Sequence, residues 1–504
     1  MNPGDSACGM NVVVLVIDTL RYDHVAPEGT DAVETPNLDR FADRSIWFSR
    51  AFTSSYPTIP ARQDMLLGRG ASPFHDWSPL DCGGPTLPGV LADAGYVTQL
   101  IHDTPHLVNG GFRIDYPFHA WTPIRGAECD RPWITSEPEF PDNWAFDDRF
   151  DGYGMERDPE AVWNGGKDTI RNYAYAHRDR TDHGDWNVAR LFQTGAEFLE
   201  DNAARENFFL WMDCFDPHEP WDAPPEYVQK YDADGEDGLI DPRSFHGEVY
   251  NDDDLAAAGR DHKVAQYRAK LTFMDRWFGE FLDALDRTGL ADNTAVLVLG
   301  DHGTSLDDNP NPGRRNFGKS WPPDQNEAHV PMMLHVPGED PGRCDTPVRS
   351  LDVFATAAAR AGATVPEGVT SHDLLRVAKD PDYRPHEVVP TSKHVDSWVG
   401  AGKGADDLLA FAYDEEWGLG LAADPEGCVL RRIGEREDVS GSHQDTVERL
   451  RSEAIAELDR LGLDDRVVAW LRSEGEEPFP EEYDGQGGSG PDWFSPYFSR
   501  PIPE

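Results

Sequence analysis

TAVLVLGDHGTS, at residues 294–305, is the segment from which the architecture of this chain can be inferred. Thr294 to Leu299 is a nearly unbroken apolar run rich in Val and Leu, which is typical of a strand buried on both faces of a parallel sheet. Asp301 and His302 follow one residue later. Ligands of open α/β sheets bind just beyond the carboxyl ends of the strands, where a carboxylate and an imidazole suit a divalent cation. A turn with a helix-capping Asp and a solvated His is the alternative.

Other apolar runs place this segment in an α/β pattern. Val12 to Ile17 is a second buried-strand run, and Asp18 follows it directly. Two strands that each end next to an Asp predict one shared site where parallel strands finish. Further strands are predicted over residues 97–101, 208–212 and 330–336, and a core-packed helix over residues 262–287. The predicted fold class is therefore α/β, with helices packed on a sheet.

Composition and charge limit the classes of partner. The chain has 504 residues, which predicts more than one structural unit. Its 93 Asp and Glu residues outnumber its 45 Lys and Arg residues, so the formal net charge is −48. This charge excludes nucleic acid and an anionic membrane as main partners, and its even spread predicts a halophile's surface that stays soluble at very high salt. Six scattered cysteines, with no Cys-x-x-Cys pair, predict neither a zinc knot nor a disulfide framework.

The sequence has no targeting signal that we recognise. No apolar run approaches membrane-spanning length, and the N-terminal segment lacks a charged region followed by an apolar one. A cytoplasmic location is therefore expected, with no membrane partner.

A polar group also stands at the start of a predicted helix. Pro60 suits the first turn of a helix that Gly68 ends. Thr58 then lies at the helix N-terminus, where free N–H groups and the helix dipole favour an anion, and Arg62 lies one turn further along the same face. Thr58 is either part of an anion site or only the cap of this helix.

With Asp18, Thr58, Arg62, Asp301 and His302 identified, the chain resembles a type I sulfatase of the alkaline phosphatase superfamily. The resemblance covers about residues 11–370 and includes Lys319. The motifs that carry it follow in the family's order: IDTLRYDH, TPNLDRFADRSIWFSRAFT, TIPARQDMLLGR, LADAGYVTQLI, FDPHEPW, LGDHG and EAHVPMMLHVPG. Together these motifs are highly specific for the family.

The predicted domain organisation has three parts. Residues 1–375 form the sulfatase-like catalytic domain, residues 376–470 a smaller C-terminal α+β subdomain, and residues 471–504 an extended acidic tail rich in Gly and Pro. For the first part, the resemblance implies the α/β/α sandwich of the alkaline phosphatase superfamily, with a mainly parallel mixed sheet.

Position 58 departs from the sulfatase pattern. Sulfatases oxidise a Cys or Ser at this place to formylglycine, whose hydrate attacks the ester, whereas this chain has Thr58. Oxidation of a secondary alcohol gives a ketone and not an aldehyde, so no formylglycine is expected. Phosphodiesterases of the superfamily use an unmodified Thr or Ser, and a hydroxyl on a metal ion loses its proton more easily. Thr58 is therefore predicted to be the nucleophile, with Arg62 supporting its position.

The resemblance also implies a metal site. Asp18, Asp301, His302 and the Thr58 oxygen are expected to hold one divalent ion. The family implies Ca²⁺, and the imidazole ligand leaves Mn²⁺ or Zn²⁺ open.

Substrate contacts are expected from two other segments. Lys319 and His218 match family residues that bind oxygens of the transferred group, and one of them is expected to protonate the leaving oxygen. Thr104 and His106 stand where many sulfatases have a Lys and then a His. They are candidates for substrate contacts, with a polar surface turn as the alternative.

The expected function is metal-dependent hydrolysis of sulfate esters on a small molecule or glycan. A phosphodiester or phosphonate monoester hydrolase is the first alternative, because Thr58 cannot become an aldehyde. A family member that binds a sulfated or phosphorylated glycan without turnover is the second. The oligomeric state does not follow from the sequence.

Overall fold

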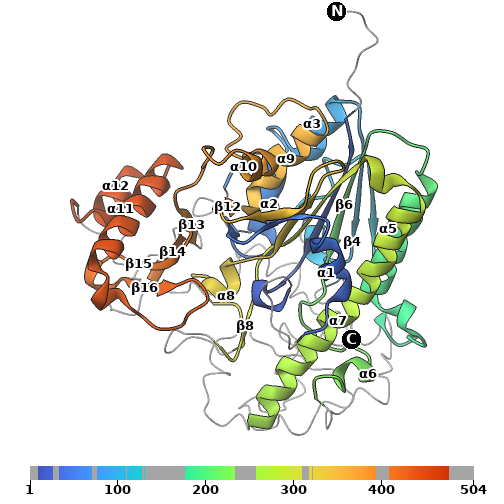
Figure 1. Cartoon of the computed structure of the whole chain (residues 1–504), viewed down its shortest axis with the longest axis horizontal. Helices are drawn as coiled ribbons and strands as arrows, with labels where there is room; N and C mark the ends of the chain where they lie inside the picture. Colours follow the sequence, from blue (N-terminus) through green and yellow to red (C-terminus); the bar gives the residue numbers. More distant parts are fainter. Residues whose placement is uncertain are drawn as a thin grey trace, which may run out of the picture.

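In the computed structural model of the chain, the described residues are 9–25, 33–70, 77–108, 111–127, 130, 176–232, 257–308, 317–320, 322–392 and 408–475. Figure 1 shows a large body built on a central sheet and a smaller C-terminal part beside it. The predicted tail lies outside the described residues from residue 476 onward.

An eight-stranded sheet, in the order β11-β2-β10-β7-β1-β6-β4-β5, forms the centre of the larger body. Its strands are β1 (Asn11–Ile17), β2 (Ile46–Phe48), β4 (Val97–His102), β5 (Ala120–Pro123), β6 (Phe208–Cys214), β7 (Thr294–Gly300), β10 (Met332–His335) and β11 (Gly342–Cys344). Neighbouring strands are parallel, except that β10 runs antiparallel to β7 and β2. The predicted mainly parallel mixed sheet is confirmed.

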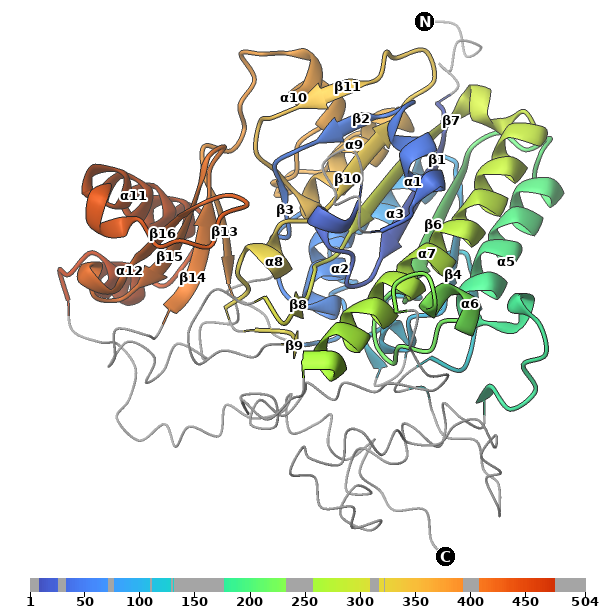
Figure 2. The ribbon, with the colours of Figure 1, turned by 60° about the horizontal axis from the view of Figure 1, so that its bottom comes forward.

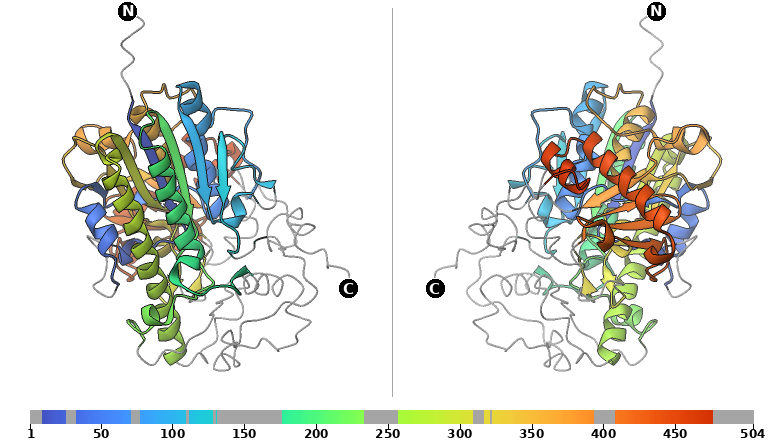
Figure 3. Two further views of the ribbon diagram at one scale, coloured as in Figure 1. Left: turned by 90° about the vertical axis from the view of Figure 1, so that its right-hand side faces the viewer. Right: turned by 90° about the vertical axis from the view of Figure 1, so that its left-hand side faces the viewer.

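Helices cover both faces of this sheet, because the central strands are apolar on both sides. Even-numbered residues of β1 pack into one core and odd-numbered residues into the other. The first core is covered by α2 (Thr58–Leu67), α3 (Leu87–Asp93), α9 (Val353–Arg360) and α10 (Leu374–Lys379), and the second by α1 (Pro36–Ala42), α5 (Asn187–Asp201) and α7 (Ala257–Arg287). Figure 3 shows α5 and α7 lying along one face of the sheet. Each fully buried Val or Leu stabilises these cores by about 1.5–3 kcal/mol.

Helix α1 is capped by a side chain from α7. The Asp275 carboxylate accepts hydrogen bonds from the backbone N–H groups of Asn37 (3.0 Å) and Leu38 (2.7 Å). Thr35, the residue at the cap position of α1, makes no capping hydrogen bond with its own side chain. Burial raises the pKa of Asp275 to about 6. This contact joins two helices that lie far apart in the sequence.

The C-terminal part has its own sheet and core. Its strands pair antiparallel in the order β13 (Val389–Ser392), β14 (Leu408–Tyr413), β15 (Trp417–Ala422) and β16 (Val429–Arg432). Helices α11 (Gln444–Arg460) and α12 (Asp465–Leu471) pack on this sheet, on the side away from the main body (Figure 2). The predicted small C-terminal subdomain is present. Its boundaries at residues 375 and 470 stay predictions.

The remaining strands and α-helices among the described residues are short. They are β3 (Ala51–Phe52) paired with β12 (Val348–Arg349), β8 (Ser305–Leu306) paired with β9 (Phe317–Gly318), α6 (Pro225–Val228) and α8 (Gln325–Ala328). No helix among the described residues has the length and apolar character needed to cross a membrane.

Candidate active site

Four neighbouring strands of the main sheet, β7, β1, β6 and β4, bring polar side chains to one edge. Asp301 and His302 follow β7, Asp18 follows β1, Asp213 is the penultimate residue of β6, and Thr104 lies two residues after β4. All five side chains are fully buried. Because side chains alternate along a strand, the three carboxylates project to the face that α2 covers.

Asp18, Asp301 and His302 form a cluster that can hold a metal ion. Each offers one ligand atom, and these atoms lie within 4.8 Å of one another. His302 Nε2 is 3.7 Å from Asp18 Oδ1 and 3.5 Å from Asp301 Oδ2. Such separations exceed hydrogen-bond lengths and suit atoms arranged around one ion, at about 2.0–2.6 Å from it. The structure therefore brings together three of the four predicted protein ligands, and coordination by Thr58 stays a prediction.

His302 is arranged as a neutral ligand. Its Nδ1 lies 2.8 Å from the Gly303 carbonyl oxygen, which only accepts, so Nδ1 carries the proton and donates it. Nε2 then presents a lone pair toward the two carboxylates and makes no hydrogen bond within the described residues. Burial, followed by the charge of Lys319, holds the pKa of His302 well below its ordinary value. A buried lone pair facing carboxylates is unfavourable unless a cation lies between them, so this donor set fits a divalent ion.

Thr19 fixes the orientation of the two carboxylates. Its backbone N–H donates to Asp301 Oδ1 at 3.0 Å, and its hydroxyl donates to Asp18 Oδ1 at 2.7 Å. Thr19 has a φ of 60°, a left-handed conformation that is strained for a β-branched residue. The Tyr267 hydroxyl on α7 donates to the Thr19 carbonyl oxygen at 2.9 Å and so helps to hold this backbone.

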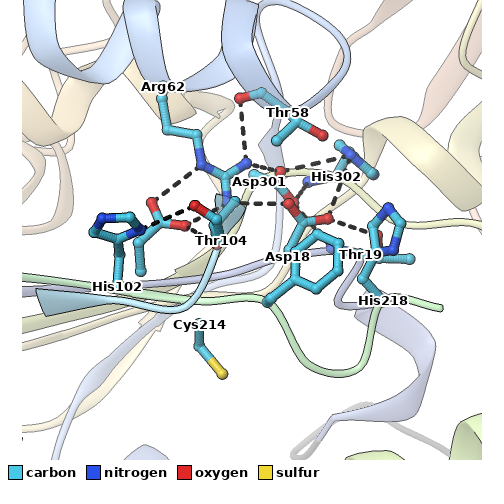
Figure 4. Close-up of polar contacts among 12 residues, drawn as sticks. Asp18, Thr19, Thr58, Arg62, His102, Thr104, Cys214, His218, Asp301 and His302 are labelled. Atoms are coloured by element: carbon cyan, nitrogen blue, oxygen red, sulfur yellow. Dashed lines mark hydrogen bonds and ion pairs between the residues drawn. The ribbon is translucent and has the colours of Figure 1, made fainter. Parts of the chain in front are cut away.

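Arg62 links the predicted nucleophile to the carboxylates. Its Nη1 donates to the Thr58 carbonyl oxygen at 3.2 Å and also to Asp301, and its Nη2 lies 3.1 Å from Asp18 Oδ2. Figure 4 shows the guanidinium between Thr58 and these carboxylates, with the Thr58 side chain pointing to the side where His302 lies. The predicted support of Thr58 by Arg62 thus has a physical basis.

Thr58 is the first residue of α2 and is 2% exposed. Pro57, and not Thr58, stands at the cap position, and the Pro57 side chain makes no capping hydrogen bond. The alternative in which Thr58 serves only as the helix cap is therefore wrong, and its hydroxyl stands beside a helix N-terminus that favours an anion.

The two carboxylates of the cluster differ in pKa. Burial raises the pKa of Asp18, but Arg62, together with smaller contributions from His218, His302 and Lys319, outweighs burial and holds that pKa well below its usual range. The pKa of Asp301 is raised well above its ordinary value, by burial first and then by the like charge of Asp18, which Arg62 does not fully offset. One guanidinium thus does not keep both carboxylates ionised, and a dication placed between them would.

Lys319 and His218 form a hydrogen-bonded pair. Lys319 Nζ donates to His218 Nε2 at 2.7 Å, and His218 Nδ1 donates to the Glu219 carbonyl oxygen at 2.7 Å. Burial, with the charge of Lys319, lowers the pKa of His218 to about 3. His218 is therefore neutral near pH 7, and its Nε2 accepts the hydrogen bond from Lys319. The charge of Lys319 helps to lower the pKa of Asp18, which places the pair next to the carboxylate cluster.

The two residues predicted from the segment after β4 have different surroundings. The Thr104 hydroxyl donates to Asp213 Oδ1 at 2.6 Å, so its proton is already engaged. The ring of His106 stacks on Phe215, with centroids 5.9 Å apart, and Phe215 stacks on His218 at 4.2 Å. Burial and His218 lower the pKa of His106 to about 3. Contact of either residue with substrate stays a prediction.

Asp213 is a site residue that the sequence reasoning missed. Arg62 donates to it twice, from Nε at 3.1 Å and from Nη2 at 2.8 Å. The strand was predicted to end at Met212, but β6 continues to Cys214, so Asp213 lies inside the strand and under Arg62. The signal was an acidic residue at the carboxyl end of a buried apolar run, the same signal that identified Asp18 and Asp301.

The site combines an anionic cluster for one cation with a helix N-terminus at the carboxyl edge of a mainly parallel sheet. This arrangement is typical of metal-dependent enzymes that hydrolyse ester bonds. Sequence comparison gives the family: the model described as Sulfatase matches residues 10–363, and the chain belongs to the sulfatase family.

Individual relatives agree with this assignment. The choline-sulfatase of Rhizobium meliloti is 25% identical over 400 residues, which cover 71% of this chain and 68% of that protein. The arylsulfatase of Clostridium perfringens is 25% identical over 433 residues, covering 72% of this chain and 78% of that protein.

Solved structures share the fold. The phosphonate monoester hydrolase of Silicibacter pomeroyi superposes with a TM-score of 0.64 at 19% identity, over 90% of this chain and 96% of that one. A protein solved with its substrate D-glucosamine-2-N,6-O-disulfate gives a TM-score of 0.63 at 14% identity, over 91% and 99%.

Proposed function

We propose that this chain hydrolyses sulfate esters with one divalent ion and with Thr58 as the nucleophile. The observation that carries the proposal is the Arg62 guanidinium, which contacts both the Thr58 carbonyl oxygen and the carboxylates of Asp18 and Asp301. This contact fixes the start of α2 against the carboxylate cluster. The nucleophile and the cation site are therefore held in a fixed position relative to each other.

A divalent cation held by Asp18, Asp301 and His302 would polarise the ester and lower the pKa of a neighbouring hydroxyl. Ca²⁺ follows from the family, while the imidazole ligand suits Mn²⁺ or Zn²⁺ equally well. Residues of the chain supply the nucleophile and stabilise the anion. The Thr58 hydroxyl loses its proton to solvent, and its oxygen attacks the sulfur of the ester in line as the bond to the leaving oxygen breaks; the N-terminus of α2 favours the anion that it approaches. Water then hydrolyses the Thr58 sulfate ester, which releases sulfate and restores the hydroxyl.

The proton for the leaving oxygen comes from Lys319 in this proposal. Of the two groups predicted for this role, His218 is neutral near pH 7, and its Nε2 accepts a hydrogen bond from Lys319 and so carries no proton to donate. Lys319 Nζ is positively charged, so it both attracts the transferred group and donates to the leaving oxygen.

Charge balance supports a substrate group with one negative charge. Among the described residues of the cluster, three carboxylates (Asp18, Asp213 and Asp301) stand beside two cations (Arg62 and Lys319). A dication reverses the sign of this balance by adding two positive charges. The resulting single positive charge suits a sulfate monoester or a phosphate diester better than a doubly charged phosphate monoester.

The same balance and the unmodified Thr58 keep a phosphodiester or phosphonate monoester hydrolase as the second candidate. Choline-sulfatase and arylsulfatase among the relatives favour sulfate. A glycan sulfate remains a candidate substrate, because one of the structural neighbours was solved with a disulfated glucosamine.

A substrate panel tests the proposal. Aryl sulfate, aryl phosphodiester, aryl phosphonate monoester and aryl phosphate monoester are assayed side by side with Mn²⁺ or Ca²⁺ at high salt. We expect turnover of aryl sulfate, no turnover by Thr58→Ala, and at least about a tenth of the wild-type rate with Thr58→Ser, which keeps a nucleophilic hydroxyl. Mass spectrometry of quenched reactions should find the sulfated Thr58 peptide.

Each other outcome has a defined meaning. Activity of a folded Thr58→Ala variant would exclude Thr58 as the nucleophile. Preference for the diester or phosphonate would select the second candidate. Zero turnover on all four substrates by protein that binds the metal would favour a glycan-binding family member without catalysis.

We also propose that the acidic surface adapts the enzyme to high salt. With a net charge of −48, the acidic groups repel one another in dilute buffer. Salt screens this repulsion, because the Debye length falls from about 10 Å at 0.1 M to about 3 Å at 1 M ionic strength. The unfolding temperature should rise steadily from dilute buffer to molar KCl. An unfolding temperature that is constant or falls with KCl would contradict the proposal.

A further inference from the structure

The carboxylate of Asp213 receives hydrogen bonds from three different side chains. Arg62 donates to both of its oxygens, Thr104 Oγ1 donates to Oδ1 at 2.6 Å, and Trp211 Nε1 donates to Oδ2 at 3.1 Å. Asp213 is 0% exposed. A carboxylate with this many donors is held in one orientation, so the guanidinium that it grips is held as well.

Asp213 lies behind the cation cluster and not in it. Strand pairing places Asp213 level with Val16 of β1, two residues before Asp18. Asp18, Asp301 and His302 form the group with metal-ligand spacing among the described residues, and Asp213 is not part of it. Asp213 therefore acts on the cluster from outside it, by its negative charge and by holding Arg62, whose other contacts reach Asp18 and Asp301 (Figure 4).

Arg62 is the group that needs this partner. Its charge stands against two of the proposed metal ligands, where an uncompensated guanidinium would repel a dication. Its Nη1 must at the same time keep its contact with the Thr58 carbonyl oxygen. Asp213 meets both needs, because it supplies a negative charge on the far side of Arg62 and binds it through two parallel hydrogen bonds.

We propose that Asp213 is a positioning residue that neutralises and orients Arg62, so that the cluster of Asp18, Asp301 and His302 binds a divalent cation while Thr58 stays in place. Arg62 thereby serves as a support for the nucleophile and not as a cation that binds substrate. This inference rests on the proposed metal site. It assigns to Asp213 a role in metal affinity as well as in kcat.

The test measures Mn²⁺ binding directly, by titration calorimetry or by electron paramagnetic resonance of free Mn²⁺, together with kcat. Asp213→Asn keeps the size and one acceptor oxygen but removes the charge. We expect its Mn²⁺ dissociation constant to rise by about 10-fold or more, as for other residues that support metal ligands, and its kcat to fall. A purely structural role would lower the unfolding temperature and leave the dissociation constant of the folded protein unchanged.

A rescue variant separates charge from structure. The double variant Arg62→Gln/Asp213→Asn removes both charges. Its Mn²⁺ dissociation constant should return to within about threefold of wild type, because the net local charge is that of wild type again. Its kcat should stay low, because Thr58 loses its support. Arg62→Gln alone should bind Mn²⁺ more tightly than the double variant. The comparison of Arg62→Gln with the double variant can be made even if Asp213→Asn does not fold, because the double variant leaves no buried guanidinium without a partner.

The matched control is Asp103→Asn at the end of the neighbouring strand β4. Asp103 is also a buried carboxyl, but it accepts from the Phe215 backbone N–H at 2.7 Å rather than from Arg62. The Asp103→Asn variant should have a Mn²⁺ dissociation constant within about threefold of wild type. Equal Mn²⁺ affinity of Arg62→Gln and the double variant, or of wild type and folded Asp213→Asn, would overturn the inference. Failure of wild type to bind Mn²⁺ would instead overturn the proposed metal site.

Discussion

Replacement of Lys319 by Met should reveal both functions of this residue. Lys319 Nζ donates to His218 Nε2 at 2.7 Å, and the residue is 7% exposed. A unit charge about 4 Å from the developing negative charge contributes about 4 kcal/mol at an effective dielectric constant of 20, which is roughly a thousandfold in rate. Loss of the proton donor adds a further factor of about 10²–10⁴ when the leaving group needs protonation.

The assay compares aryl sulfates that differ in the acidity of the leaving phenol. An acidic nitrophenol leaves without a proton, so Lys319→Met should lose only the electrostatic part of the rate with this substrate. A weakly acidic phenol needs the proton, so the loss there should be larger and the dependence on leaving-group pKa should become steeper. Lys319→Arg keeps the charge but donates a proton poorly, and should recover activity mainly for the acidic phenol. An equal loss for both substrates would refute the assignment of Lys319 as proton donor.

Two predictions concern stability away from the site. Asp275→Ala leaves the first N–H groups of α1 without their acceptor and should lower the free energy of unfolding in urea by about 2–3 kcal/mol. Asp286→Ala, which breaks an exposed pair with Arg44, should change the free energy of unfolding by less than about 1 kcal/mol. Similar values for the two variants would contradict the capping role. Burial, followed by Arg50, lowers the pKa of His329 to about 3 in the folded state, so the unfolded chain binds the extra proton between about pH 6.5 and 3. The free energy of unfolding should thus decrease on acidification through this range, and His329→Gln should remove about 1.4 kcal/mol per pH unit of that slope; an unchanged slope would exclude His329 as a cause.

The cation cluster could be predicted because its strands are recognisable in the sequence. Strands buried on both faces appear as unbroken apolar runs, and β7 and β1 match the predicted runs to within one residue. Parallel strands must end at the same edge, so the polar residues after each run, Asp18, Asp301 and His302, were expected to meet. The family resemblance then indicated Thr58, Arg62, His218 and Lys319.

Other parts of the site depend on information that the sequence does not carry locally. Asp213 is 151 residues from Arg62 in the sequence. An acidic residue near the end of a strand cannot be told, from the sequence, from an acidic residue just beyond the strand. The left-handed backbone of Thr19 follows from its contacts with Asp301 and Tyr267, and no local pattern marks it. Strand β14 was likewise not predicted, because its run of mostly small and apolar residues has no clear alternation.

X-ray diffraction from crystals soaked in Mn²⁺, recorded at a wavelength where manganese scatters anomalously, examines the cation site itself. We expect a single strong anomalous peak bonded to carboxylate oxygens of Asp18 and Asp301 and to His302 Nε2, with the Thr58 hydroxyl oxygen at the same ion. A peak elsewhere in the molecule, or no peak among these three side chains at saturating Mn²⁺, would contradict the metal-dependent mechanism.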